Sequence, residues 1–222
     1  MTGQTRGGAG FFVAIEGVEG SGKSTQAALL ADHLRARGRR VRLAREPGST
    51  PLGERVRETA LGDPHLAVPP RSELFLMLAA RAAFFEQVVE PELAAGAIVI
   101  ADRYELSTFA YQGGGRGLPL EQVRLCNAFA TGGLAADVTL LFDLPVEEGR
   151  RRQAGAGKRP DRMEGAAADF HSRVAAAYRR LADEHPGVIV VAASGDPAAV
   201  HGGVVAELEA RFPETFPRAR VI

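Results

Sequence analysis

Residues 17–24 read Gly17-Val18-Glu19-Gly20-Ser21-Gly22-Lys23-Ser24. An apolar run, Phe11 to Ile15, precedes this stretch, and a helical pattern, Gln26 to Arg37, follows it. The order of strand, glycine-rich loop and helix is the context that the phosphate-binding pattern G-x-x-x-x-G-K-[ST] requires. Glycines let backbone N–H groups turn toward phosphate oxygens, and the N-terminus of the following helix favours negative charge. The alternative is a glycine-rich turn that fits the pattern by chance; the flanking elements disfavour it, so the sequence predicts a nucleoside triphosphate site.

Nine residues in and just after this loop are expected to bind ATP. They are Gly17, Val18, Glu19, Gly20, Ser21, Gly22, Lys23, Ser24 and Thr25. The ammonium group of Lys23 can reach the β- and γ-phosphates, and the hydroxyl group of Ser24 can hold Mg²⁺.

The composition limits the class of protein. The chain has 222 residues with 27 basic and 27 acidic side chains, which argues against a general nucleic-acid or membrane-surface binder. The longest apolar run, residues 93–101, is shorter than the ~18 residues that a membrane span needs. The single cysteine, Cys126, excludes an internal disulfide and indicates a cytoplasmic location. We expect residues 1–10 to form a flexible tail and residues 11–222 to form one domain.

Short apolar runs alternate with longer helical patterns along the whole chain. The runs expected to be strands are Phe11–Ile15, Val41–Ala44, Ala97–Ala101, Val138–Phe142 and Val188–Val191. Each fits a strand that is buried on both faces. The alternation predicts a five-stranded parallel sheet flanked by helices, the P-loop NTPase type of α/β fold, with ligands at the carboxyl ends of the strands. Little chemistry is expected after Glu184.

Arginines occur at three places where that rule predicts a site. Arg45 directly follows the second strand, although a solvated loop arginine is the alternative. Arg81 lies in the apolar stripe of a long helical segment, four residues after Met77, where it either snorkels to the surface or points into a polar pocket. Arg103 follows Asp102 at the end of the third strand, where an aspartate that holds Mg²⁺ is expected and an arginine can bind an anion bidentately.

Four side chains after Arg103 are expected to share one face of a helix. They are Tyr104, Ser107, Thr108 and Tyr111. For the two tyrosines, simple core packing is the alternative.

Residues 150–164 alternate basic side chains with glycines, and Pro160 interrupts any helix. We interpret this segment as a mobile lid whose arginines close over the triphosphate and neutralise charge in the transition state. The alternative is a solvated surface loop. Because the sequence lacks the Asn-Lys-x-Asp motif of GTPases and offers many arginines to a second phosphorylated substrate, it favours a nucleotide kinase. In such a reaction the attacking phosphate oxygen is already ionised, so no catalytic base is needed.

The sequence resembles the thymidylate kinase family over nearly the whole chain after residue 10. Four blocks carry the resemblance: Ile15 to Gln26, the Arg-Glu-Pro-Gly block Arg45 to Glu54, the Asp-Arg-Tyr block Asp102 to Gln112, and the lid end Asp161-Arg162-Met163-Glu164. The second and third blocks are more specific than the phosphate loop alone.

The resemblance implies transfer of a phosphate from ATP to dTMP, with Mg²⁺, in a cytoplasmic homodimer. It implies that Arg45 and Arg103 hold the dTMP phosphate, that Arg81 hydrogen-bonds thymine, and that Tyr111 lies under the deoxyribose. The full substrate set is Glu19, Arg45, Met77, Arg81, Arg103, Ser107, Thr108 and Tyr111. Metal ligands are expected to be Ser24, Asp102 and Glu164, and the catalytic residues Lys23 and Arg103 with lid arginines in the order Arg162, Arg159, Arg152. The lid supplies these arginines, as in the bacterial branch of the family, because the phosphate loop contains none.

One departure from the family pattern leaves undetermined which base the monophosphate substrate carries. The family usually has an aromatic residue four positions before the base-binding arginine, and here that position is Met77. A kinase for dUMP or a modified pyrimidine nucleotide is therefore the alternative. A regulatory nucleotide-binding protein without turnover is a third hypothesis, which the presence of Lys23, Ser24, Asp102 and Arg103 disfavours.

Overall fold

A parallel β-sheet forms the centre of the computed structural model, which describes residues 10–155 and 161–218. Within these residues five strands lie in the order β2-β3-β1-β4-β5. They are β1 (Phe11–Gly17), β2 (Val41–Arg45), β3 (Ile98–Asp102), β4 (Val138–Asp143) and β5 (Val188–Ala192). Every neighbouring pair is parallel, so the predicted sheet is confirmed.

Helices connect the strands and cover both faces of the sheet. The α-helices are α1 (Lys23–Ala36), α2 (Pro51–Arg57), α3 (Pro70–Phe84), α4 (Glu90–Ala94), α5 (Glu105–Thr108), α6 (Leu120–Ala130), α7 (Val146–Gly155), α8 (Ala168–Glu184) and α9 (Pro197–Arg211). Wider, π-helical turns are η1 (Glu58–Gly62), η2 (Phe85–Val89) and η3 (Phe109–Gly115). The predicted long helical segment is thus α3, η2 and α4 in succession.

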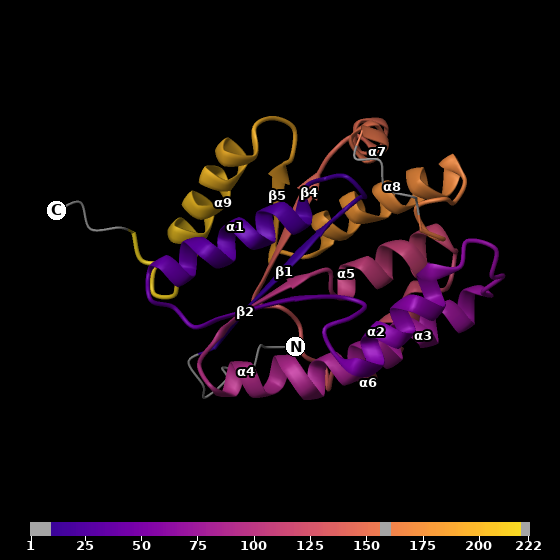
Figure 1. Cartoon of the computed structure of the whole chain (residues 1–222), viewed down its shortest axis with the longest axis horizontal. Coiled ribbons are helices and arrows are strands. Elements are labelled where there is room, and N and C mark those ends of the chain that lie inside the picture. Colours follow the sequence, from indigo (N-terminus) through magenta and orange to yellow (C-terminus); the bar gives the residue numbers. More distant parts are fainter. Residues whose placement is uncertain (1–9, 156–160, 219–222) are drawn as a thin grey trace.

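The sheet separates two groups of helices. Figure 1 shows α1 and α9 together on one side and α2 to α6 on the other. Alternate residues of β1 follow this division: Val13 and Ile15 pack with the α1 and α9 side chains, whereas Phe12 and Ala14 pack in the cluster that contains Phe84 of α3. Burial on both faces explains why the strands read as continuous apolar runs.

Helix α8 packs closely on η3 because η3 ends in glycines. A Cβ atom on Gly115 would lie 2.5 Å from the Phe170 ring, so only glycine fits this contact. Tyr104 does not share the face of the residues that follow it, contrary to the expectation from helical spacing. It precedes α5, packs edge-on against Phe12 and donates its hydroxyl hydrogen to the Leu134 carbonyl oxygen at 3.0 Å.

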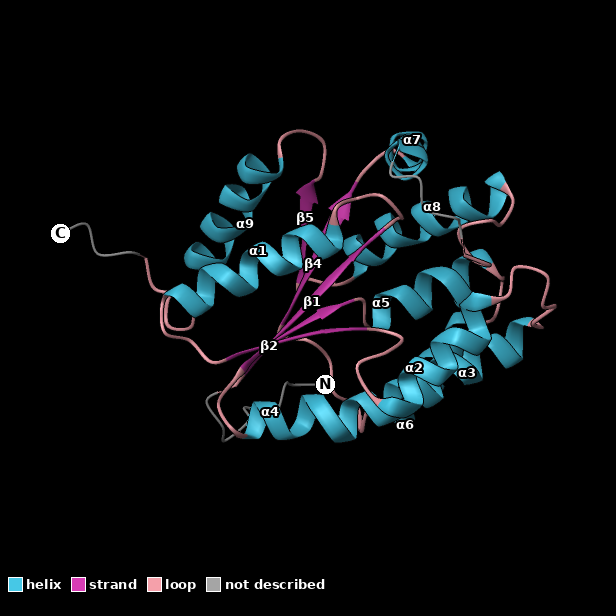
Figure 2. Ribbon diagram, viewed as in Figure 1, coloured by secondary structure: helices cyan, strands magenta, loops and turns pink. Residues whose placement is uncertain are grey.

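The carboxyl ends of the strands lie along one edge of the sheet, toward which the arrowheads fan out in Figure 2. Asp102 of β3 is paired in register with both Ile15 of β1 and Arg45 of β2. The phosphate loop, Arg45 and the Asp102-Arg103 pair are therefore neighbours by sheet topology. Among the described residues, no helix is long and apolar enough to cross a membrane.

Candidate active site

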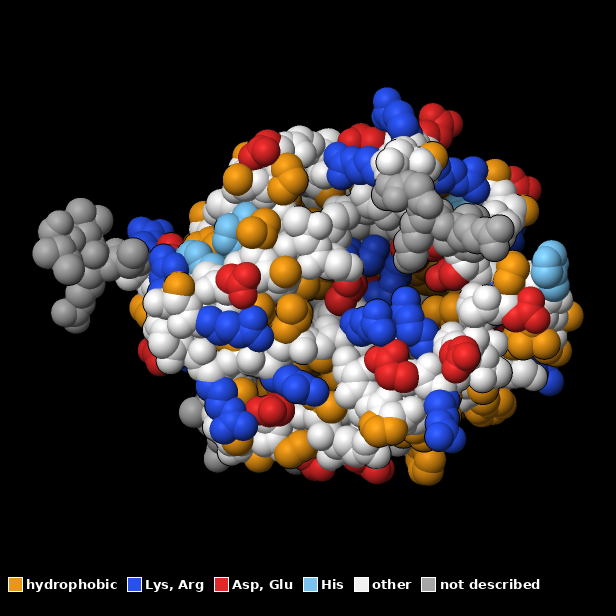
Figure 3. Space-filling model, viewed as in Figure 1, with side chains coloured by type: hydrophobic (Ala, Val, Ile, Leu, Met, Phe, Trp, Pro, Cys, Tyr) orange, Lys and Arg blue, Asp and Glu red, His pale blue; other side chains and the backbone are white. Residues whose placement is uncertain are grey.

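A cavity of about 710 Å³ lies at this edge. Figure 3 shows lysine and arginine side chains gathered around a hollow in the face of the molecule, with acidic side chains beside them. The cavity is lined by most of the residues that the sequence singles out: Glu19, Gly20, Ser21, Gly22, Lys23, Ser24, Thr25, Arg45, Met77, Arg81, Asp102, Arg103, Ser107, Thr108, Tyr111, Arg152 and Glu164. The phosphate loop and the residues predicted to bind the second substrate thus border the same cavity.

The side chain of Lys23 folds back onto the backbone of the phosphate loop. The Lys23 ammonium donates to the Val18 carbonyl oxygen at 2.6 Å. Burial, together with repulsion from Arg103, lowers the pKa of Lys23 from its usual value to about 8. Gly17 and Val18, the first two predicted ATP-binding residues, do not line the cavity; they shape the turn behind it.

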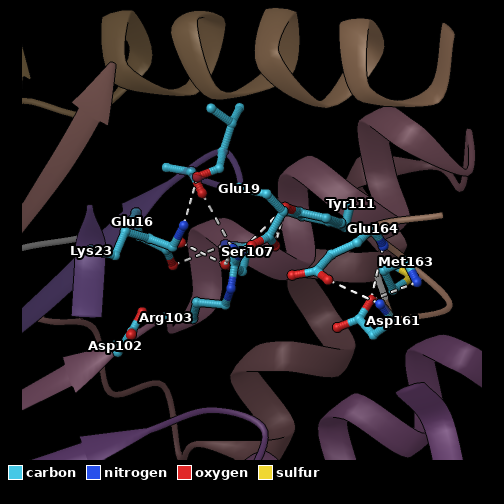
Figure 4. Close-up of polar contacts among 12 residues, drawn as sticks. Glu16, Glu19, Lys23, Asp102, Arg103, Ser107, Tyr111, Asp161, Met163 and Glu164 are labelled. Carbon is cyan, nitrogen blue, oxygen red and sulfur yellow. Dashed lines mark hydrogen bonds and ion pairs between the residues drawn. The ribbon is translucent and has the colours of Figure 1, made fainter. Parts of the chain in front are cut away.

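Arg103 is the centre of the polar network in the cavity (Figure 4). Its guanidinium group donates to five oxygen atoms, those of Gly17 O (3.3 Å), Ser107 Oγ (3.0 Å), Tyr178 OH (3.3 Å), Tyr111 OH (3.3 Å) and Glu19 Oε1. Its backbone has a φ of 76°, which a side chain other than glycine rarely adopts. A hydrogen bond from Arg103 N to Ile15 O at 2.9 Å holds this conformation, so the fold itself aims the guanidinium group.

Sequence reasoning missed the carboxylate that supports this network. Glu16 of β1 is fully buried and accepts hydrogen bonds from Tyr104 N (2.8 Å), Ser107 N (2.9 Å), Ser107 Oγ (2.6 Å) and Tyr178 OH (2.9 Å). These bonds offset the cost of burying the carboxylate. Ser107 and Tyr178 in turn hold Arg103. The signal in the sequence was an acid that directly follows the apolar run Phe11–Ile15, before the glycines of the phosphate loop.

Arg81 is only 3% exposed, so it does not snorkel to the surface. Its guanidinium nitrogens donate to Glu46 Oε2 (2.8 Å), Thr108 Oγ1 (2.7 Å), Asn127 Oδ1 (2.8 Å) and Tyr104 O (2.9 Å). This is the polar pocket that the sequence offered as one of two alternatives. Met77, Arg81 and Thr108 all border the cavity, and Gln112, which was not predicted, borders it beside them.

Two arginines reach the cavity from the second strand and the helix after it. Arg45 is paired with Glu54 at 3.0 Å, and both side chains are about half exposed. Arg57 of α2 also lines the cavity and donates to the Pro47 carbonyl oxygen at 3.1 Å. Sequence reasoning missed Arg57 because a basic residue inside a surface helix has no distinctive pattern.

The predicted lid is split between the described and undescribed parts of the chain. Arg159 lies outside the described residues. Arg152 borders the cavity, where it is bonded to Glu148 Oε1 at 2.5 Å and to Ala193 O at 3.2 Å. The structure does not bring Arg162 to the cavity: its side chain donates to Glu73 Oε2 at 2.6 Å and to Ala60 O at 2.7 Å. That Arg162 is the most important catalytic arginine of the lid stays a prediction. Of the two described arginines, Arg152 is the one that borders the cavity.

The loop after β5 contributes a wall of the cavity through Ala193, Gly195 and Pro197. The expectation of little chemistry after Glu184 stays a prediction, because lining the cavity does not show that these residues take part in a reaction. The rule that ligands lie at the carboxyl ends of parallel strands applied to β5 as well, but the small apolar residues of this loop carry no chemical signal.

Two of the three predicted Mg²⁺ ligands lie together. Ser24 Oγ donates to Asp102 Oδ2 at 2.5 Å beside the phosphate loop, and such hard oxygen donors suit Mg²⁺. Glu164 borders the cavity, but its carboxylate oxygens accept hydrogen bonds from Gln153 and from the Asp161 backbone, both at 2.9 Å. Among the described residues no group of three His, Cys, Asp or Glu side chains could hold a metal ion.

The chain is similar to known proteins of one enzyme family. The family model for thymidylate kinase matches residues 15–204. The chain belongs to the thymidylate kinase family. A thymidylate kinase of Pseudomonas fluorescens (strain Pf0-1) is 46% identical over 188 residues, which make up 85% of this chain and 89% of that protein. One from Chromobacterium violaceum is 44% identical over 201 residues, 90% of this chain and 94% of that protein.

A solved structure gives the same assignment. The crystal structure of thymidylate kinase from Ehrlichia chaffeensis matches with a TM-score of 0.73 at 29% identity, covering 90% of this chain and 99% of that chain. As a thymidylate kinase, this chain has the P-loop NTPase fold and is a phosphotransferase. The hypothesis of a regulatory protein without turnover is thereby disfavoured further.

Proposed function

We propose that this thymidylate kinase transfers the γ-phosphate of ATP to dTMP in the cavity described above, giving ADP and dTDP. The observation that carries the proposal is that one continuous cavity is bordered both by the phosphate loop with Lys23 and by Arg103, Tyr111 and Arg81. A phosphate donor and a phosphorylated acceptor can therefore meet without leaving the site. Such proximity supplies much of the catalysis of phosphoryl transfer.

The roles of the side chains follow from their charge and position. Lys23 lies in the loop that would hold the triphosphate, and we propose that it exchanges the Val18 carbonyl oxygen for phosphate oxygens. Arg103, with Arg45, would bind the dTMP phosphate, and the hydroxyl groups of Ser107 and Tyr111 keep Arg103 in place. Thr108 accepts a hydrogen bond from Arg81, and we propose that the thymine base lies beside this pair. Lid arginines Arg152, Arg159 and Arg162 are proposed to neutralise charge on the transferred phosphoryl group.

Mg²⁺ is proposed as the cofactor, held by Ser24 and Asp102, with Glu164 as a third candidate. When bound, it would supply positive charge that offsets the negative charge of the triphosphate. The hydrogen bond of 2.5 Å between Ser24 and Asp102 keeps both oxygens at the edge of the phosphate loop, ready to exchange this bond for a metal ion.

The substrate assignment is tested by measuring ADP release with ATP-Mg²⁺ and a panel of dTMP, dUMP, dCMP, dGMP and UMP. We expect a strong preference for dTMP. If the enzyme prefers another pyrimidine nucleotide to dTMP, the substrate would instead be of the kind that Met77 suggested as the alternative. No turnover with any of the five would contradict the kinase proposal.

The role of Arg81 is tested by a pair of variants. Arg81→Met should raise the KM for dTMP by about 10- to 100-fold through the loss of a charged hydrogen-bond donor. It should also lower the free energy of unfolding by about 3 kcal/mol, because Glu46 then keeps a buried charge without its partner. The double variant Glu46→Gln, Arg81→Met removes both charges and should regain stability while the KM stays high. A KM that recovers together with the melting temperature would show that Arg81 is only structural.

We further propose that the chain works as a cytoplasmic homodimer, that residues 11–222 act as one domain with a lid at 150–164, and that residues 1–10 are a flexible tail. Residues 1–9 lie outside the described structure. Helices α3 and α6 expose Phe75, Leu125 and Phe129 at 61%, 71% and 93%, which suits these helices to a contact between copies. A free Cys126 fits a reducing compartment.

Phe129→Asp is expected to convert the homodimer to a monomer, because it would place a charge in an apolar contact. The measurement is molar mass by light scattering coupled to size-exclusion chromatography. Leu66→Asp, which alters an exposed apolar residue between η1 and α3, is the matched control and should leave the mass unchanged. A dimer that survives Phe129→Asp would place the contact elsewhere, and a monomeric wild type would contradict the proposal.

A further inference from the structure

A buried carboxylate next to the cavity has a role that the proposed mechanism does not use. Glu73 of α3 is fully buried and does not border the cavity. Its oxygens accept four hydrogen bonds: Oε1 from Gln112 Nε2 (2.9 Å) and Arg116 Nε (3.1 Å), and Oε2 from Arg116 Nη2 (3.0 Å) and Arg162 Nη2 (2.6 Å). Of these three partners only Gln112 borders the cavity.

The chemistry of the two groups fixes which way the Gln112 amide faces. An ionised carboxylate only accepts hydrogen bonds, so Gln112 must present its NH₂ end to Glu73 and its carbonyl oxygen at the opposite end. Burial alone would raise the pKa of Glu73, but the hydrogen bonds from Arg116, Gln112 and Arg162 keep it below its usual value. The carboxylate therefore stays ionised and cannot donate a proton to a reversed amide.

The bidentate contact of Arg116 with Glu73 makes this arrangement rigid. The Arg116 guanidinium group also stacks on the Phe170 ring at 4.4 Å, which ties it to α8. Glu73 is thus anchored on one side by a fixed cation, and the Gln112 side chain, which is 2% exposed, has little room to turn.

We propose that Glu73 is a positioning residue for base selection: by fixing the amide of Gln112, it presents a hydrogen-bond acceptor to the pyrimidine. Thymine and uracil carry a hydrogen on N3 and can donate to this acceptor. Cytosine has a lone pair on N3, which a carbonyl oxygen repels. The inference rests on the proposed function, because it takes the base of the monophosphate to lie beside Gln112, Met77 and Arg81.

The test is the ratio of kcat/KM for dTMP to that for dCMP in Glu73→Gln. A glutamine at this position can accept from or donate to Gln112, so the amide loses its single orientation. We expect the ratio to fall by about 10- to 100-fold, the range for a mispaired buried hydrogen bond. The ratio of dTMP to dUMP should change by less than about twofold, since both bases carry the N3 hydrogen. Equal losses for all three nucleotides would overturn the proposal.

Two further variants separate base selection from stability. Leu208→Ala removes a fully buried side chain of α9 and should lower the melting temperature without changing the dTMP to dCMP ratio. Gln112→Leu should lower the ratio by itself, and Glu73→Gln should then cause no further fall, as expected for residues that act as one unit. If Glu73→Gln does not fold, an unchanged ratio in Gln112→Leu overturns the proposal.

Measurements on the wild-type protein separate a failure of the proposed function from a failure of the role proposed for Glu73. If the wild type neither binds nor phosphorylates dTMP, the proposed function fails and this inference fails with it. If the wild type prefers dTMP and Glu73→Gln keeps the wild-type ratio, only the role of Glu73 is overturned.

Discussion

Lys23→Ala is expected to lower kcat by at least about 10³-fold, because it removes a positioned cation from the place where charge develops on the transferred phosphate. Lys23 is buried against the phosphate loop, and in the structure its ammonium is bonded to a backbone carbonyl oxygen of that loop. No other lysine lines the cavity in the described part of the chain, so no second ammonium group of that part can take its place. The measurement is ADP release with saturating ATP-Mg²⁺ and dTMP.

The control for this experiment is a cation of similar chemistry away from the cavity. Arg211→Ala removes an exposed side chain of α9 that pairs with Glu207 at 3.1 Å, and it should leave kcat unchanged. Circular dichroism should show that both variants are folded. A Lys23→Ala enzyme with wild-type kcat would show that the triphosphate is not bound by this loop.

The parts of the site that could be predicted from the sequence are those set by local pattern and sheet topology. The loop around Lys23 has a fixed motif, and Asp102 and Arg103 follow directly on a buried strand. Because parallel strands end at one edge, residues from separate parts of the chain could be assigned to one cavity by their positions relative to the strands.

The parts that could not be predicted depend on contacts between distant segments. Glu73 lies in the first turn of α3, where an acid is ordinarily a surface residue that interacts with the helix dipole. Its partners Arg116 and Arg162 are 43 and 89 residues away in sequence. Only packing reveals that this acid is buried. Tyr104 was misplaced for a related reason, since helical spacing was counted across the junction between β3 and α5, where the chain is not yet helical.

Arg162→Ala is expected to lower kcat by about 10³-fold while the affinity for dTMP stays nearly unchanged, as for other arginines that act on the transition state. In the structure this side chain is bonded to Glu73 and Ala60, so the prediction requires it to exchange Glu73 for the nucleotide. After that exchange Glu73 would still be paired with Arg116, which donates two hydrogen bonds to its carboxylate. The measurements are kcat and dTMP binding by calorimetry.

Arg152→Ala is the matched comparison, because Arg152 already borders the cavity and pairs only with Glu148 and a backbone carbonyl oxygen in the described structure. If Arg162→Ala keeps a normal kcat but weakens dTMP binding, Arg162 is an anchor for Glu73, and the large loss of kcat should appear in Arg152→Ala instead. If both variants lose kcat with dTMP affinity intact, the lid supplies two cations to the transition state. The split between kcat and dTMP affinity therefore assigns each arginine, because an anchor of Glu73 acts on the bound base and a transition-state cation acts only on the transferred phosphate.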